Sequence, residues 1–218
     1  MKNVLITGVS TGIGRATAED LLQRGYRVFG SVRKPADADR LASELSSAFT
    51  PLLFDVTDEA AIGVAAEQLT QEIGNEGLAG LVNNAGIAVA GPLMHLPLAE
   101  FRKQFEVNVI GVLAVTQAFL PLLGAQTPQT RPPGRIVHIS SVSGTITYPF
   151  LGAYAASKRA LEAIADAMRR ELMVYGIEVS VVAPGSVRTP IWDKAEQIDM
   201  SPYAGTVYEA AEIGRAHV

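Results

Sequence analysis

The sequence of 218 residues contains no cysteine. The chain therefore forms no disulfide bond and offers no thiolate to a metal ion. Only three histidines are present, His95, His138 and His217, and they are scattered along the chain. Their spacing does not match a set of metal ligands, so we expect no metal centre.

Clusters of positive charge and long apolar runs are also missing. The net charge is −4 and no basic run occurs, so we expect neither a nucleic acid nor an anionic membrane as a partner. No apolar run approaches the ~18 residues of a membrane span. The short apolar segment Val4–Ile6 does not resemble a secretion signal, which makes the cytoplasm the expected location.

The composition indicates a packed globular domain, with 48% hydrophobic and 18% charged residues. Short apolar runs alternate with segments of helical periodicity. This order predicts an α/β fold, a doubly wound parallel sheet of the Rossmann type with helices on both faces. The six predicted strands are Asn3–Thr7, Tyr26–Val32, Pro51–Phe54, Leu78–Val82, Arg135–Ser140 and Ile177–Ala183. The main predicted helices end near Gly25 and Ile73 or cover Asp37–Ser47, Leu98–Leu123 and Gly152–Val174.

A glycine-rich turn follows the first predicted strand and contains Gly8, Gly12 and Gly14. A strand, a glycine turn and a helix form the start of a dinucleotide-binding unit, in which the helix N-terminus faces the phosphates. A plain turn is the alternative. The position directly after the first strand favours dinucleotide binding.

The second predicted strand ends at Val32 and is followed by Arg33 and Lys34, with no carboxylate until Asp37. An acidic residue near this point is typical of NAD binding. A guanidinium suits a 2′-phosphate instead, so Arg33 favours NADP(H), with NAD(H) as the alternative. A solvated basic turn is the simpler interpretation of the same residues.

Asn83 to Gly86 follow the fourth strand, at the carboxyl end where ligands bind in open α/β sheets. They also fit an ordinary turn. Asn108 lies inside a predicted helix, with a bend expected near Gly111, and asparagine is a poor helix former. It therefore either faces solvent or has a functional role, whereas His138 in the fifth strand is expected to be a packing residue.

Tyr154 and Lys158 are four residues apart in a predicted helix, so both lie on one face. An ammonium one turn away favours the phenolate and lowers the pKa of a tyrosine. The pair is therefore a candidate proton donor and acceptor for alcohol and carbonyl chemistry. Taken alone, a surface pair explains the same spacing.

In combination these residues resemble the short-chain dehydrogenase/reductase family. The matching motifs are T-G-x-x-x-G-I-G from Thr7, the strand end at Asp55, N-N-A-G from Asn83, Y-x-x-x-K from Tyr154 and P-G-x-V-x-T from Pro184. The resemblance extends from Thr7 to about Pro190. It implies an NAD(P)-dependent oxidoreductase that acts on the CH-OH group of an alcohol, or on the corresponding carbonyl, and forms a homodimer or homotetramer.

The resemblance also implies roles for individual residues. Tyr154 would be the acid/base, Lys158 would lower its pKa and hold the nicotinamide ribose, and Ser141 would bind the substrate oxygen. Ser140 and Ser143 compete with Ser141 for that role. Asn108 would hold a water that links Lys158 to solvent. The expected cofactor-binding residues are Gly8, Ser10, Thr11, Gly12, Ile13, Gly14, Arg33, Asp55, Val56, Asn84, Ala85, Gly86, Tyr154, Lys158, Val187 and Thr189.

Family members usually continue through a substrate-covering loop, a helix and a seventh strand. We therefore expect a single domain over residues 1–211 that is truncated at its C-terminus. Residues 212–218 are expected to be a non-native tail, because one possible codon sequence for its last six residues is similar to a sequencing-library adapter. Such a chain would expose an apolar sheet edge at the sixth strand and be poorly soluble.

Other functional classes predict different features. A nucleotide-binding module without chemistry, or an inactive fragment, is the main alternative, although both Tyr154 and Lys158 are present. A sugar-nucleotide epimerase of the extended group prefers another glycine spacing and a longer chain. The substrate is not defined by the sequence. Apolar side chains that suit either a substrate pocket or ordinary packing are Leu93, Met94, Val142, Tyr148, Phe150 and Trp192.

Overall fold

The computed structural model describes residues 1–189, 191 and 203–208. The predicted domain boundary at residue 211, the predicted tail at 212–218 and the candidate pocket residue Trp192 lie outside the described residues.

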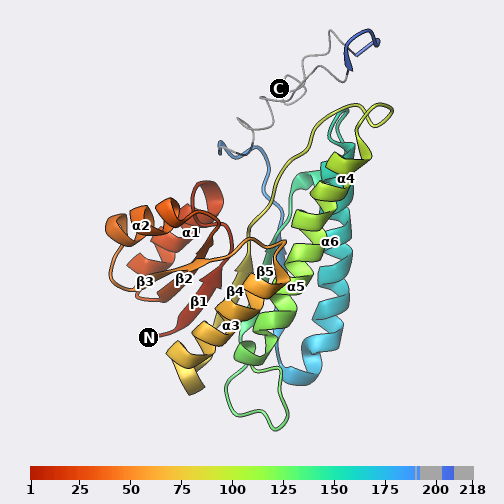
Figure 1. Cartoon of the computed structure of the whole chain (residues 1–218). Helices are drawn as coiled ribbons and strands as arrows, with labels where there is room; N and C mark the ends of the chain where they lie inside the picture. The colour runs from red at the N-terminus through yellow and green to blue at the C-terminus, as the bar shows by residue number, and fades with distance from the viewer. Residues whose placement is uncertain (190, 192–202, 209–218) are drawn as a thin grey trace.

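Six parallel strands form one sheet in the order β3-β2-β1-β4-β5-β6 (Figure 1). The order reverses between β1 and β4, as in other doubly wound sheets, and the predicted fold class is confirmed. The strands are β1 Asn3–Ile6, β2 Arg27–Val32, β3 Phe49–Leu53, β4 Gly80–Asn83, β5 Arg135–Ile139 and β6 Glu178–Val182.

Helices cover both faces of the sheet. The α-helices are α1 Gly12–Gln23, α2 Pro35–Glu44, α3 Glu59–Ile73, α4 Leu98–Phe105, α5 Gly111–Phe119 and α6 Gly152–Glu171. Short turns of other helix types are η1 Gly74–Glu76, η2 Glu106–Ile110, η3 Leu120–Leu123, η4 Val142–Gly144 and η5 Leu172–Tyr175.

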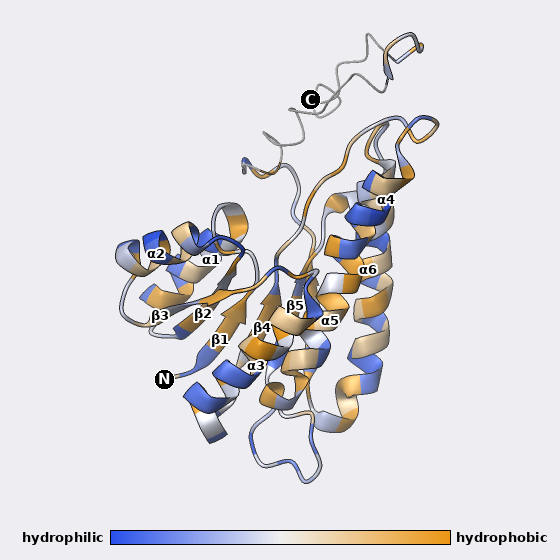
Figure 2. Cartoon of the chain, in the orientation of Figure 1, coloured by the Kyte–Doolittle hydropathy of each residue, from blue (hydrophilic) through white to orange (hydrophobic). Residues whose placement is uncertain are grey.

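Alternate residues of the central strands enter two separate cores, because side chains of a strand point to opposite faces. In β1, Leu5 packs in the core formed with α3, α5 and α6, whereas Val4 and Ile6 pack in the core formed with α1 and α2. The same division separates Phe29 from Val28 in β2. Figure 2 shows the central strands mainly hydrophobic and the outer helix α2 mainly hydrophilic. This two-sided burial explains the nearly continuous apolar runs in the sequence.

Most predicted element boundaries differ from the observed ones by one to three residues, and two of these differences have local reasons. Strand β3 begins at Phe49 rather than Pro51, because Phe49 and Thr50 already pair with β2. Proline within a strand is tolerated at a sheet edge, and β3 is an edge strand. Helix α2 begins at Pro35 rather than Asp37, since a proline without an N–H fits the first helical position.

The predicted helical run Leu98–Leu123 is present but is not a uniform α-helix. Its central five residues, Glu106–Ile110, form a π-helical segment immediately before Gly111, where the sequence predicts a bend. Such segments are frequent at functional sites. Among the described residues this run is also long and apolar enough to cross a membrane, contrary to the sequence prediction. Half of its most apolar stretch is buried inside the fold.

Strand β6 forms the edge of the sheet beyond β5, and no described strand pairs with its outer side. Its residue Val182 is exposed, whereas Val179 is buried in the core below. The side chain of Arg169 on α6 donates a hydrogen bond to the carbonyl of Val179, at 2.8 Å. In the described part of the chain, the predicted sheet edge is therefore open, although a guanidinium satisfies one of its carbonyls.

Candidate active site

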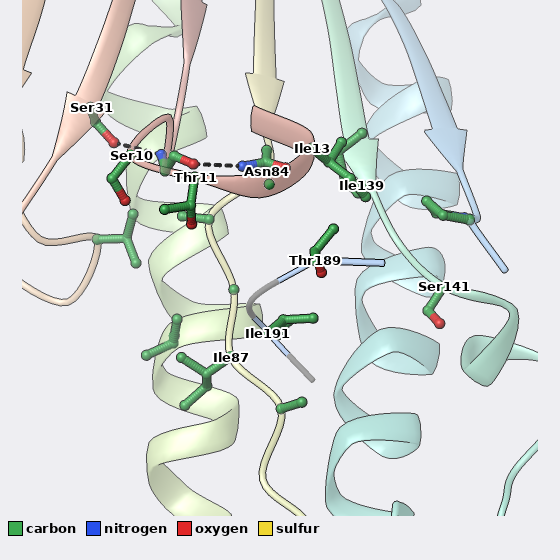
Figure 3. Close-up of a pocket in the computed structure, with 18 of the residues that line it drawn as sticks. Ser10, Thr11, Ile13, Ser31, Asn84, Ile87, Ile139, Ser141, Thr189 and Ile191 are labelled. Carbon is green, nitrogen blue, oxygen red and sulfur yellow. Dashed lines mark hydrogen bonds between the residues drawn. The ribbon is translucent and has the colours of Figure 1, made fainter. Parts of the chain in front are cut away.

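The glycine turn between β1 and α1 is held in a conformation that depends on its glycines. Gly8 and Gly12 have φ angles of +71° and +62°, a region that L-residues with side chains rarely adopt. The N–H of Gly8 donates to Oγ of Ser31 at 3.0 Å, which ties the turn to the end of β2 (Figure 3). Helix α1 begins at Gly12, within this turn. The free N–H groups at its N-terminus are therefore placed to bind a phosphate.

Asn84 locks the turn against the end of β4. Its Nδ2 donates to the carbonyls of Thr7 and Gly8, at 2.8 and 3.0 Å. A Cβ on Gly14 would lie 2.3 Å from that Nδ2 and 2.5 Å from the carbonyl oxygen of Gly8. Gly14 therefore leaves the space that close packing beneath the turn requires, and its cofactor-binding role stays a prediction.

A cavity of about 270 Å³ lies at the carboxyl ends of the strands, and segments that end or follow all six strands contribute to it. Figure 3 shows Ser10, Thr11 and Asn84 on one side and Thr189 and Ser141 on the other. Apart from Gly14 and Asn108, every predicted site residue lines this cavity. Ser140, which the sequence analysis gave as an alternative to Ser141, also lines it. The lining residues absent from the sequence prediction are Ser31, Val32, Phe54, Ile87, Ala88, Val107, Ile139, Pro184, Gly185 and Ile191.

Arg33 lies at the rim of the cavity beside Asp55. One of its guanidinium nitrogens is 3.7 Å from Oδ2 of Asp55, and its side chain is 63% exposed. An exposed pair of this length contributes little to stability. The guanidinium is therefore accessible at the end of β2, while Asp55 and Val56 line the wall beside it.

Tyr154, Lys158 and Ser141 meet at the opposite end of the cavity. Tyr154 and Lys158 are both about 5% exposed, so the predicted pair is not a surface pair. The ammonium nitrogen of Lys158 lies 5.7 Å from the centre of the Tyr154 ring and donates to the carbonyl of Ile139 at 2.7 Å. Ser141 supplies a hydrogen bond to Tyr154.

Burial changes the acidity of this pair. Burial lowers the pKa of Lys158 to about 8, and the negative charge of the Glu162 carboxylate partly opposes this shift. Burial also raises the pKa of Tyr154, and the hydrogen bond from Ser141 acts in the opposite direction. The sequence prediction of a lowered tyrosine pKa is thus wrong for this state, because desolvation of the phenolate outweighs the hydrogen bond from Ser141.

Asn108 lies behind the cavity wall and does not face solvent, being 1% exposed. Its Oδ1 accepts from the N–H of Ile87 at 2.9 Å, and its Nδ2 donates to the Ile87 carbonyl at 3.0 Å and to Oγ of Ser157 at 3.2 Å. Gln104, which the sequence prediction missed, holds the same segment through the Ile87 carbonyl and the N–H of Val89. These amides fix the wall of the cavity; the water-holding role of Asn108 stays a prediction.

The residues that sequence reasoning missed carried weak signals. Ser31 is a polar residue among the apolar buried residues of β2, and Gln104 is a fully buried amide in a helix that presents many polar side chains. Buried polar groups require hydrogen-bond partners. That requirement is a useful sign of a functional position once burial is known. His138, in contrast, is buried in β5 with Nδ1 3.3 Å from Nδ2 of Asn83, which agrees with its predicted packing role.

A sequence model of the family described as short chain dehydrogenase matches residues 2–199. Similar curated proteins include an NADPH-dependent 3-dehydrocapnine reductase from Ornithobacterium rhinotracheale, which is 46% identical over 95% of this chain and 73% of the relative. Retinol dehydrogenase 5 from Homo sapiens is 41% identical over 86% of this chain and 57% of that protein.

Solved structures agree with the fold. A short-chain dehydrogenase from Streptomyces avermitilis is 34% identical with a TM-score of 0.78, over 86% of this chain and 66% of that one. The structure described as ElxO with NADP bound is 29% identical with a TM-score of 0.80. That similarity covers 88% of this chain and 77% of the other.

Proposed function

Because the chain belongs to the short-chain dehydrogenase family and is thereby an oxidoreductase that acts on CH-OH groups, we propose that it reduces a carbonyl substrate with NADPH. The observation that supports this most directly is the shared cavity. Tyr154, Lys158 and Ser141 line one end, and the glycine turn lines the other. The proposal keeps the cytoplasmic location and the homo-oligomer expected from the sequence.

The residues present fit a dinucleotide. The cradle at Gly8 and Gly14 has no room for a Cβ, and the α1 N-terminus opens behind it. The pyrophosphate would lie over Gly12 and Ile13, and the nicotinamide end beside Val187 and Thr189. When bound, NADPH supplies a hydride to the carbonyl carbon.

The protein's part of the reaction is proton delivery. The Tyr154 hydroxyl transfers its proton to the substrate oxygen as negative charge develops there, which completes the alcohol. The Ser141 hydroxyl donates a hydrogen bond to the same oxygen. The Lys158 ammonium stabilises the Tyr154 phenolate that remains until solvent returns a proton. At neutral pH the Tyr154 phenol carries its proton, because burial raises its pKa, and proton transfer therefore depends on the Lys158 charge to stabilise the phenolate that forms.

A direct test is the consumption of NADPH by the purified chain with a panel of aldehydes and ketones, both apolar and polar. We expect turnover with at least one of them and none without substrate. NADPH binding without turnover on any carbonyl, or with any alcohol and NADP⁺, would favour the nucleotide-binding module instead.

The cofactor preference is tested at Arg33. Arg33→Asp should weaken NADPH binding by about 10- to 100-fold, because the charge-assisted bond to the 2′-phosphate is lost and a carboxylate takes its place. Binding of NADH should be unchanged or improved. Titration of both nucleotides by protein fluorescence measures the two affinities.

Arg24→Asp is the matched control, since Arg24 is an exposed arginine at the end of α1 that pairs with Asp20. It should leave both affinities near those of the wild type. Equal affinity of the wild-type chain for NADPH and NADH would contradict the assignment of Arg33.

A further inference from the structure

Glu162 lies on α6 one turn beyond Lys158 and two turns beyond Tyr154, on the same helix face. Its carboxylate is directed at the turn that follows β5. Oγ of the buried Ser140 donates to Oε1 of Glu162 at 2.8 Å. Ser140 immediately precedes Ser141, so this carboxylate holds the backbone on one side of the substrate-facing serine.

The same carboxylate also packs against the other side of the turn. A Cβ on Gly144 would lie 2.5 Å from Oε1 of Glu162 and 3.2 Å from Oγ of Ser140. Gly144 is itself bonded back to Ser141, because its N–H donates to the Ser141 carbonyl at 2.8 Å. The carboxylate therefore fills a space between residues 140 and 144 that only a glycine leaves open.

The Ser141 hydroxyl depends on the shape of this turn. Its Oγ accepts from the N–H of Ser143 at 3.1 Å, which sets the direction of the side chain. A second tie from α6 reaches the far end of the turn, where Arg159 donates to the carbonyl of Thr145 at 3.1 Å. Helix α6 thus carries Tyr154 and Lys158 and also holds the segment that carries Ser141.

We infer that Glu162 is a positioning residue for the proposed reaction, which aligns Ser141 with Tyr154 through Ser140 and places a carboxylate one helical turn from Lys158. This inference rests on the proposed function. Glu162 does not line the cavity. It acts through Ser140 and Lys158, which both line it.

The electrostatic part follows from the surroundings of Lys158. Its charge is disfavoured by burial and supported by Glu162. The other titratable groups that face it are Tyr154 on α6 and His138 on β5, whose pKa of about 4 leaves it uncharged at neutral pH. Among the described residues, the Glu162 carboxylate is therefore the anion near Lys158 at neutral pH. Its removal should lower the pKa of Lys158 further below about 8.

Three variants separate the two effects. Glu162→Gln keeps an acceptor oxygen for Ser140 but removes the charge, Ser140→Ala removes the hydrogen bond but keeps the charge, and Glu162→Ala removes both. Glu171→Gln at the exposed end of the same helix is the matched control. The readouts are kcat for carbonyl reduction against pH, NADPH affinity, melting temperature and the titration of Lys158 by ¹³C-lysine NMR, with the signal assigned from Lys158→Met.

We expect Glu162→Ala to lower kcat by about 10- to 100-fold, because a catalytic group displaced by about 1 Å loses that much. Glu162→Gln should shift the Lys158 titration, and the loss of kcat at high pH, to lower pH. Ser140→Ala should lower kcat without moving either titration. Glu171→Gln should match the wild type in every readout.

The inference is overturned if kcat and the Lys158 titration are unchanged in both Glu162 variants. It is also overturned if kcat falls only in proportion to melting temperature or NADPH affinity, which is what a purely structural residue would do. The NMR titration needs no substrate. A wild-type chain without turnover would therefore count against the proposed function alone, while the titration still decides the link between Glu162 and Lys158.

Discussion

Replacing Tyr154 with phenylalanine should lower kcat by about 10²- to 10⁴-fold, the usual contribution of a positioned acid or base. The ring of Tyr154 is buried and its replacement keeps the packing, so the fold and the cavity should be preserved. Only the hydroxyl that donates the proton, and its hydrogen bond with Ser141, are lost. Initial rates of NADPH consumption under saturating substrate measure the effect.

NADPH affinity should stay within about twofold of the wild type, because the Tyr154 hydroxyl acts in the proton-transfer step and not in the binding of the cofactor before that step. Tyr175→Phe in η5 is a matched control that removes a phenol hydroxyl from a partly buried tyrosine outside the cavity. It should leave kcat unchanged. Turnover by Tyr154→Phe close to the wild-type rate would show that another group donates the proton.

Gly14→Ala should have the largest effect on the cofactor site. The added Cβ would overlap Nδ2 of Asn84 and the carbonyl of Gly8, and both atoms belong to the network that joins the glycine turn to β4. Overpacking of this kind costs about 1–3 kcal/mol. The same free energy applied to binding weakens NADPH affinity by about 5- to 150-fold. Chemical denaturation and fluorescence titration measure the two quantities.

Gly63→Ala is the corresponding control, since it also adds one methyl group to a helical glycine. A Cβ at Gly63 meets no atom within 4 Å, and the residue lies in the interior of α3. Alanine should therefore stabilise the protein by about 0.5–1 kcal/mol and leave NADPH binding unchanged. A Gly14→Ala protein as stable as Gly63→Ala would contradict the close packing under the turn.

The sequence predicted the strands, because the central strands are buried on both faces and form short apolar runs. It also predicted residues that meet in one cavity, since Gly8, Asn84 and Ser141 each follow a parallel strand and line the cavity at the carboxyl ends of the sheet. Asp58 precedes α3 and caps its N-terminus, because its side chain accepts a hydrogen bond from the N–H of Ala61. Local patterns of this kind depend on few neighbours, which is why sequence alone predicts them.

Other properties depend on contacts between distant segments. The partner of Ser140 is Glu162, and the partner of Asn108 is the backbone of Ile87, pairs that no local pattern connects. The direction of the Tyr154 pKa required the depth of burial, which spacing from Lys158 does not provide. The π-helical segment differs from an α-helix by one hydrogen-bond step and leaves no clear compositional signal.

The π-helical segment Glu106–Ile110 changes the direction in which side chains point between the first and second halves of the run Leu98–Leu123. Each residue of an α-helix advances the side-chain direction by about 100°, and the wider π turn changes the alignment of everything that follows it. Gln104 and Asn108 can consequently form hydrogen bonds with the backbone of Ile87. Val115 and Phe119, further along the same run, pack in the core. The run Leu98–Leu123 thereby directs polar side chains at the cavity wall in its first half and apolar side chains at the core in its second half. In an uninterrupted α-helix these two sets of side chains would point in nearly the same direction.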